Sequence, residues 1–162
     1  MKTLVYGYGN PGRKDDGLGN AFIEVLEEWV KNEDLNHISL DSNYQLNIED
    51  AEVISNYDLV IFVDASIEEN IEPYVLTKVD PNDSRIEFTM HAVSVPFVLD
   101  LCQKIHKKTP LTYLLHIKGY EWDFVEELTS KALENLNLAV EFIKPILINP
   151  NILIKRPNII GL

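Results

Sequence analysis

The sequence has a single cysteine, Cys102, and few basic residues for its length. One cysteine excludes an intrachain disulfide, and its place in an apolar helical stretch is typical of a small buried hydrophobe. Against 26 acidic residues stand only 14 Lys and Arg, which gives a net charge of −12. The densest basic group is the pair Lys107-Lys108. The composition therefore argues against partners that are nucleic acids or anionic membranes.

Long hydrophobic runs are also absent from the 162 residues. No segment approaches the ~18–20 apolar residues of a membrane span, and the first predicted strand begins at Leu4 without the layout of a signal peptide. We therefore expect a cytoplasmic protein. Its length is enough to bury roughly 68–70% of the unfolded surface, and it predicts one domain over residues 1–162, which we expect to be a monomer.

Predicted strands and helices alternate along the chain, which predicts an α/β fold. The architecture expected is a three-layer α/β/α sandwich whose sheet is mostly parallel, with an antiparallel edge strand at 74–79. The other predicted strands are 4–6, 38–41, 59–63 and 111–120. Four helices are predicted. The first starts after Asp16, the second covers 47–54, the third ends near His106, and the fourth extends from about 129 to Pro145.

The sequence also predicts how three of these helices begin or pack. Asn47 is the expected N-cap of the short second helix. Pro96 fits poorly inside a helix, so either Ser94 caps the third helix or that helix is kinked. The last helix is expected to turn its apolar residues inward, namely Leu133, Leu136, Val140 and Ile143.

The loop after the first strand has glycines at 7, 9 and 12 and then the pair Asp15-Asp16. One interpretation makes one aspartate the N-cap of the following helix. A second takes G-x-G-x-x-G as a dinucleotide site. It is weakened because the aspartates would face the pyrophosphate and because Asp41 follows Gly12 by more than the usual ~20 residues. A third makes one of the aspartates a ligand of a cation.

Parallel strands deliver further polar residues to the same edge of the predicted sheet. Asp16, Asp41 and Asp64 follow the first three strands, and His91 stands at the start of the next helical segment. Two carboxylates about 6.5 Å apart repel each other by about 2.5 kcal/mol at an effective dielectric constant of 20, so a proton, a basic side chain or a cation has to compensate. The other histidines, which are given no role, are His37, His106 and His116.

The segment GYGNPGRKDDGLG, residues 7–19, resembles the N-terminal signature of the hydrogenase maturation endopeptidases. These proteins remove a C-terminal extension from the large subunit of nickel–iron hydrogenases. The resemblance continues at FVDAS, which contains Asp64, and at TMHAVS, which contains His91. It departs after the second strand, where Asp41-Ser42-Asn43 replaces an Asp-Gly-Gly-Thr-like turn and leaves open which hydrogenase is served.

The resemblance implies that Asp16, Asp64 and His91 form the catalytic and metal-binding site. It further implies that they engage nickel supplied by a hydrogenase large-subunit precursor, with no organic cofactor. The activity it implies is that of an aspartate-dependent endopeptidase, a metal-binding hydrolase. Two alternatives stay open: a non-catalytic chaperone that checks or delivers nickel, and a phosphate- or nucleotide-binding α/β module that uses the glycines with Arg13 and Lys14.

Overall fold

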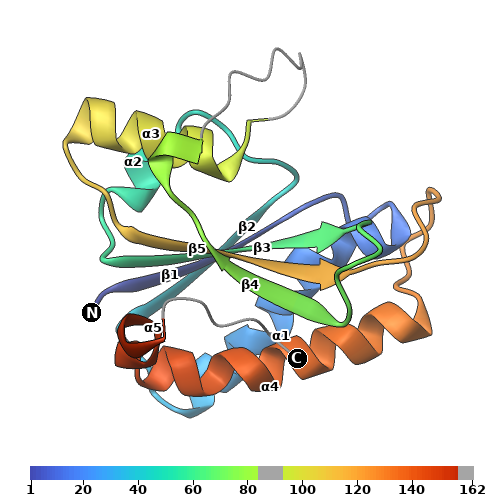
Figure 1. Cartoon of the computed structure of the whole chain (residues 1–162). Helices are drawn as coiled ribbons and strands as arrows, with labels where there is room; N and C mark the ends of the chain where they lie inside the picture. The colour runs from blue at the N-terminus through green and yellow to red at the C-terminus, as the bar shows by residue number, and fades with distance from the viewer. Residues whose placement is uncertain (84–92, 157–162) are drawn as a thin grey trace.

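A five-stranded sheet between two layers of helices forms the protein, seen in a computed structural model that describes residues 1–83 and 93–156 (Figure 1). The sheet has the order β2-β1-β3-β5-β4; its first four strands in that order are parallel, and β4 pairs antiparallel with β5 at the edge. The predicted α/β/α sandwich with an antiparallel edge strand is therefore confirmed. The strands are β1 (Thr3–Tyr8), β2 (Ile38–Asn43), β3 (Leu59–Ser66), β4 (Tyr74–Lys78) and β5 (Leu111–Lys118).

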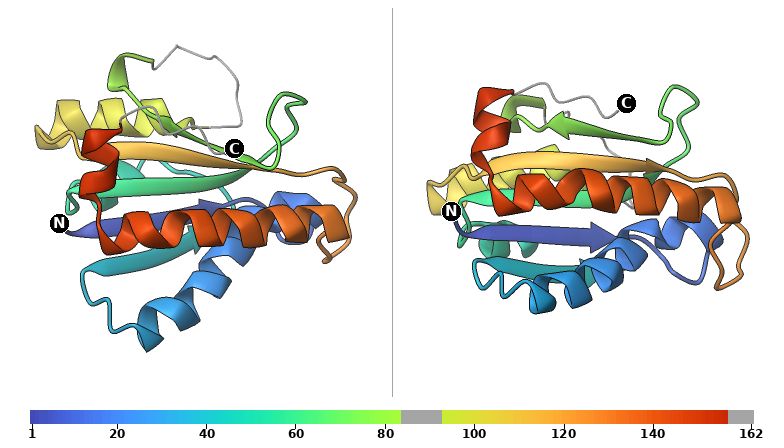
Figure 2. Two further views of the ribbon diagram at one scale, coloured as in Figure 1. Left: turned by 60° about the horizontal axis from the view of Figure 1, so that its bottom comes forward. Right: turned by 90° about the horizontal axis from the view of Figure 1, so that it is seen from below.

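The helices cover both faces of the sheet (Figure 2). One layer consists of α1 (Leu18–Asn32) and α4 (Ser130–Ile148), with the short α5 (Asn151–Lys155) packed on the end of α4. The other layer consists of α2 (Asp50–Ile54) and α3 (Val95–His106). Two 3-10 turns complete the described elements, η1 (Lys14–Gly17) and η2 (Pro81–Asp83). Within residues 1–83 and 93–156, none of the helices combines the length and the apolar character needed to cross a membrane.

The core lies on both sides of β3, whose first five residues are fully buried. Such a continuous apolar run is typical of a parallel strand covered on both faces. Because side chains alternate along a strand, Ile61 and Val63 face α1 and α4, whereas Val60 and Phe62 face α2 and α3. The residues predicted to alternate along β5 all contribute to the α1/α4 side: Leu111, Tyr113, Leu115 and Ile117.

The starts of two helices match the sequence predictions, and that of a third does not. The Ser94 hydroxyl caps α3 by accepting a hydrogen bond from the Phe97 N–H at 3.3 Å, which places Pro96 in the first turn, where a proline is tolerated. Thr129 caps α4 in the same way. Asn47 does not cap α2. Its own N–H instead donates to the Asp50 carboxylate at 2.7 Å.

The last helix differs from its prediction in length and in one buried position. It continues through Pro145 to Ile148; the proline has no N–H to donate, but its carbonyl oxygen still accepts a hydrogen bond from the Asn149 N–H at 3.0 Å. Leu133 is 47% exposed, so its predicted place in the core is wrong. The helix turns Ala132 and Leu136 to the sheet, and this register leaves Leu133 at the solvent side.

Asp41 does not stand beyond the end of the second strand, as the sequence predicted. The strand β2 extends to Asn43, so Asp41 lies inside it, paired in register with Tyr6 of β1. Its side chain is exposed and accepts a hydrogen bond from the Ser42 N–H at 2.8 Å. The end of β2 was predicted too early because its last residues are polar, and an edge strand does not need the apolar run that marks a central one.

Candidate functional site

The carboxyl ends of β1 and β3 lie side by side where the connections of the sheet change direction. The chain leaves β1 for β2 on one side, and from β3 it continues to β4 and β5 on the other. In open α/β sheets such a switch point is where ligands bind. The start of α1 approaches this edge closely, because a Cβ atom on Gly19 would lie 2.6 Å from the carbonyl oxygens of Tyr8 and Val63. Glycine at this position lets the helix deliver the preceding residues to the switch point.

Asp16 belongs to η1, directly in front of α1. Its carboxylate accepts a hydrogen bond from the Asn10 N–H at 3.0 Å, which fixes the orientation of the side chain. The chain reverses at Gly9, whose φ of 142° and whose contact with the Asp16 carbonyl oxygen leave no room for a side chain. The glycine-rich loop therefore holds an aspartate at the edge of the sheet.

Asp64 lies near the end of β3, half-buried, on the face that carries Phe62. Burial raises the pKa of its carboxyl from an ordinary value of 3.8 to about 7. The charge of Asp16 adds to the rise, whereas hydrogen bonds from the Tyr8 hydroxyl and the Ala65 backbone oppose it. The same environment raises the pKa of Tyr8 well above its usual range, first by burial and then by the charge of Asp64.

The structure thus brings together two of the residues predicted for the site, Asp16 and Asp64. The third predicted residue, His91, lies outside the described residues. Within residues 1–83 and 93–156 no group of three or more His, Cys, Asp or Glu side chains is arranged to hold a metal ion. The described part of the site is therefore a pair of half-buried carboxylates, Asp16 and Asp64, in which burial raises the pKa of Asp64 and the charge of Asp16 adds to the rise.

His116 is a neighbour of this pair that the sequence reasoning left without a role. It lies on β5 in register with Asp64, on the face of the sheet that turns toward α2 and α3. Burial lowers the pKa of its imidazole, and the charge of Glu68 opposes that shift. The alternation along β5 does place His116 opposite the buried residues of the α1/α4 face. The pairing with Asp64 needed the strand register, which the sequence does not contain.

Asp15 is not the N-cap of its own helix, because neither η1 nor α1 has a side-chain cap. It is fully buried and accepts four hydrogen bonds from the β5–α4 loop. The donors are the N–H groups of Tyr120 and Glu121, at 2.8 and 3.2 Å, and both the N–H and the hydroxyl of Thr129, each at 2.8 Å. Asp15 therefore joins two loops that are far apart in sequence and takes no part in the Asp16–Asp64 pair.

The amides of the glycine-rich loop already have partners within the protein. The Asn10 N–H donates to Asp16, and the Gly12 N–H donates to the Asn10 side chain at 2.9 Å. The two basic side chains of the loop face the β5–α4 loop, where Lys14 pairs with Glu121 at 3.3 Å and the Arg13 Nε donates to the Trp122 carbonyl at 3.3 Å. A phosphate needs these amides and cations, so the geometry disfavours the nucleotide-binding alternative.

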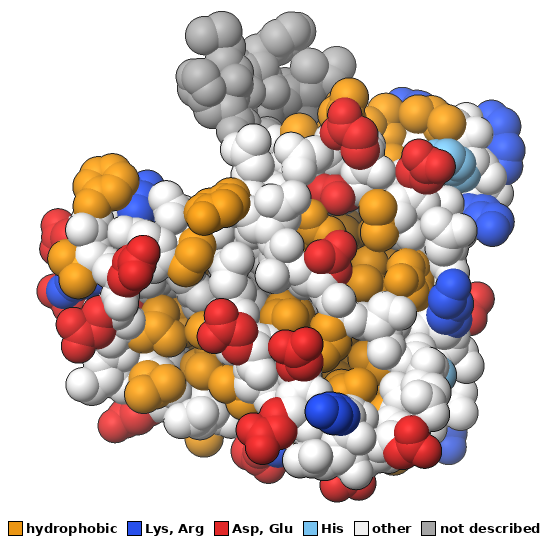
Figure 3. Space-filling view, turned by 180° about the vertical axis from the view of Figure 1, so that it is seen from behind, with side chains coloured by type: hydrophobic (Ala, Val, Ile, Leu, Met, Phe, Trp, Pro, Cys, Tyr) orange, Lys and Arg blue, Asp and Glu red, His pale blue; other side chains and the backbone are white. Residues whose placement is uncertain are grey.

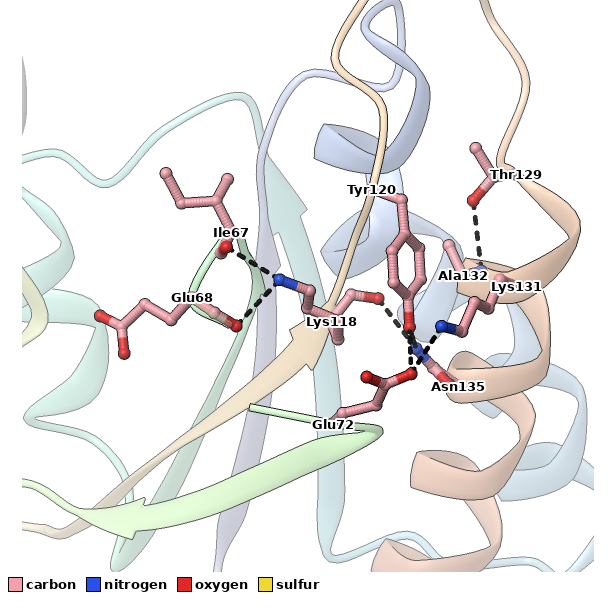
Figure 4. Close-up of polar contacts among 9 residues, drawn as sticks. All are labelled: Ile67, Glu68, Glu72, Lys118, Tyr120, Thr129, Lys131, Ala132 and Asn135. Atoms are coloured by element: carbon pink, nitrogen blue, oxygen red, sulfur yellow. Dashed lines mark hydrogen bonds and ion pairs between the residues drawn. The ribbon is translucent and has the colours of Figure 1, made fainter. Parts of the chain in front are cut away.

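The acidic loop between β3 and β4 is anchored at the same edge (Figure 4). The buried ammonium group of Lys118 donates to the carbonyl oxygens of Ile67 and Glu68, at 2.8 and 2.9 Å. Farther along the loop, Glu72 pairs with Lys131 of α4 at 2.8 Å. The charge of Glu72 therefore has a structural partner, whereas the side chain of Glu68 stays exposed.

No protein-family model and no curated protein sequence matches the chain. Solved structures do. The [NiFe] hydrogenase maturation protease HycI from Thermococcus kodakarensis KOD1 superposes with a TM-score of 0.73 at 23% identity, covering 91% of this chain and 93% of that one. The hydrogenase maturating endopeptidase HybD from E. coli superposes with a TM-score of 0.69 at 18% identity, covering 93% of this chain and 94% of that one. The hydrogenase 2 maturation peptidase from Thaumarchaeota archaeon SCGC_AB-539-E09 has a TM-score of 0.66 at 19% identity, covering 91% of this chain and 98% of that one. The chain therefore has the fold of the hydrogenase maturation proteases.

Proposed function

We propose that this chain is an endopeptidase that removes the C-terminal extension of a nickel-loaded hydrogenase large-subunit precursor. The observation that carries the proposal is the Asp16–Asp64 pair at the switch point of a sheet with the maturation-protease fold. The glycine-rich segment 7–19 resembles the signature of those endopeptidases and supplies one of the two carboxylates. Fold, motif and chemistry thus support the same activity.

Asp64 has the properties that peptide hydrolysis asks of a proton carrier. The reaction adds water to the carbonyl carbon of the scissile bond and expels an amine, so one proton leaves the water and one reaches the amine nitrogen. A carboxyl whose pKa is about 7 exists in both protonation states at neutral pH. In our proposal the ionised Asp64 accepts the proton of the attacking water and then delivers it to the leaving amine.

Asp16 is assigned to the nickel of the precursor. Burial raises the pKa of Asp64 and the charge of Asp16 adds to the rise, so a cation between the two carboxylates would offset their repulsion; oxygen donors suit divalent first-row metals. Carboxylates hold nickel less tightly than a set that includes thiolates. We therefore propose that the metal belongs to the substrate and serves as a recognition element, with His91 as the predicted ligand beside Asp16.

The test compares nickel-loaded with nickel-free precursor, incubated with wild-type protein and with Asp16→Asn, Asp64→Asn and Asp41→Asn. Asp41 is the matched control because it is an exposed aspartate on the edge strand. We expect cleavage of the nickel-loaded form only, lost in the first two variants and kept in the third. Equal cleavage of the nickel-free form would contradict the role of the metal.

The metallochaperone alternative gives a different result in the same experiment. A chaperone would bind the nickel-loaded precursor and leave its length unchanged, and binding would weaken in Asp16→Asn. Mass spectrometry of the precursor separates the two outcomes, because cleavage removes a discrete C-terminal peptide.

A further inference from the structure

The β5–α4 loop, residues 119–129, is held rigidly against the loop that carries Asp16. Beside the four hydrogen bonds to Asp15, the Lys14 N–H donates to the Val125 carbonyl at 2.8 Å, and the Asp15 N–H donates to the Glu121 carbonyl at 3.1 Å. The Arg13 guanidinium lies 5.1 Å from the centre of the Phe124 ring. Figures 1 and 2 show the two loops side by side at the carboxyl edge of the sheet.

This fixed loop presents large apolar side chains to solvent. Phe124 is 83% exposed and Val125 is 45% exposed, although their backbone is tied down. Single exposed hydrophobics are ordinary, but here others follow the neighbouring strands at the same edge. The apolar rim, as we call this set, consists of Tyr44, Ile48, Ile67, Phe124 and Val125. These residues come from the loops after β2, β3 and β5, which surround the ends of β1 and β3.

The apolar rim is interleaved with acids. Exposed carboxylates flank Phe124 and Val125 on both sides, at Asp123, Glu126 and Glu127. Glu68 and Glu69 lie next to Ile67 on the loop after β3. In Figure 3, which sees the molecule from behind, hydrophobic and acidic side chains alternate on the left, where the loops of the carboxyl edge lie. A segment that combines apolar and basic side chains complements such a surface, since its apolar side chains can pack on the apolar rim and its basic side chains can pair with the carboxylates.

We propose that the apolar rim binds the segment of the precursor that flanks the cleavage site, and that this segment carries apolar and basic residues. The inference rests on the proposed function and names what that site binds beside the nickel. Phe124 is the main anchor, because it is the most exposed aromatic of the rim and stands on its most firmly held loop. An anchor that is rigid before binding loses little conformational freedom when a partner covers it.

The test is the steady-state cleavage of nickel-loaded precursor by Phe124→Ser. The side chain is exposed, so the substitution leaves the core intact. Burial of a phenylalanine in the complex predicts a rise in KM of about tenfold or more, with kcat close to that of the wild type. The matched control is Ile105→Ser, another exposed apolar residue (63%) at the end of α3, where the chain returns to the opposite edge of the sheet. Its KM should equal that of the wild type.

A second pair of variants tests the charge of the partner. Replacing both Glu126 and Glu127 by Lys should raise KM, and added salt should reduce the difference from the wild type because it screens exposed charges. The same double change at Glu27 and Glu28, exposed on α1, alters the net charge equally and should leave KM unchanged.

The outcomes separate this inference from the proposed function. If the wild type does not cleave the precursor, the proposed function fails. If the wild type cleaves and Phe124→Ser matches Ile105→Ser, the apolar rim is not the docking surface and the proposed function stands. A fall in kcat at unchanged KM would also overturn the inference, because it would assign Phe124 to the chemical step.

Discussion

Asp15 and Asp16 are neighbours in one loop, yet their carboxylates have opposite surroundings. Asp15 is fully buried and accepts four hydrogen bonds from the β5–α4 loop. Asp16 is half-buried, accepts one hydrogen bond from Asn10, and faces the carboxyl of Asp64. Two identical side chains thus serve different ends. Asp15 holds two loops together, whereas Asp16 stands beside Asp64, a second carboxylate whose negative charge repels its own.

In our proposal this difference separates a structural carboxylate from a functional one. A buried carboxylate with several donors stabilises the fold, since each charge-assisted hydrogen bond replaces a contact with water. Asp16 instead stands beside Asp64, whose pKa is raised by burial and by the charge of Asp16. A raised carboxyl pKa costs stability at neutral pH, and such costs are concentrated at functional sites. Four variants test this division, starting with the largest expected effect.

Asp16→Asn should lower precursor cleavage at least about 100-fold and leave the melting temperature close to that of the wild type. The asparagine oxygen can still accept the hydrogen bond from Asn10, so the loop keeps its shape. Cleavage assays and calorimetry on the same preparation measure both effects. A large fall in the melting temperature would place Asp16 with Asp15 among the structural residues.

Asp15→Ala should destabilise the protein by about 3 kcal/mol, because four donors of the β5–α4 loop lose their acceptor inside the protein. Chemical denaturation gives the free energy of unfolding. At a temperature where the variant is folded, cleavage should fall less than in Asp16→Asn. Equal loss of cleavage in a variant of native stability would show that the two roles are wrongly divided.

The stability of Asp64→Asn relative to the wild type should rise by roughly 2 kcal/mol between pH 5 and pH 8. The sign follows from the raised pKa. The protonated carboxyl contributes stability that is full below about 3.8, declines as the pH rises, and is lost above about 7. Asparagine does not titrate and escapes this loss. Unfolding curves at both pH values test the prediction, and a pH-independent difference would contradict it.

Tyr120→Phe should destabilise the protein by about 1 kcal/mol and leave cleavage unchanged. Its hydroxyl accepts a hydrogen bond from the buried Asn135 at 2.8 Å and donates one to Glu72 at 3.0 Å (Figure 4). These contacts tie the β5–α4 loop to α4 and to the loop before β4, away from Asp16. Reduced cleavage at unchanged stability would move Tyr120 from the structural to the functional group.

Much of the fold was predictable because its central strands carry strong local signals. The apolar run at 59–63 and the alternation at 111–117 identify β3 and β5, and Ser94 and Thr129 mark two helix starts. The strand β2 was predicted too short, because an exposed edge strand has no apolar pattern that marks its end. The exposure of Leu133 depends on how α4 rotates against the sheet, which local sequence does not determine.

The site was predictable only in part. That Asp16 and Asp64 lie together follows from one rule, that parallel strands end at one edge of a sheet. The role of Asp15 depends on partners 105 to 114 residues away, and the place of His116 depends on strand register. Neither relation leaves a local signal in the sequence. The prediction for His91 falls outside the described residues and remains a prediction.

The hydrogen bonds between Asp15 and the β5–α4 loop can form only late in the synthesis of the chain. At ~5–20 residues per second, a ribosome needs roughly 5–20 s to extend the chain from Asp15 to its partners. Throughout that time the growing chain contains both Asp15 and Asp16, but not the frame that orients them. The geometry of the aspartate loop is thus a late product of synthesis, and a fragment that ends before β5 cannot hold it.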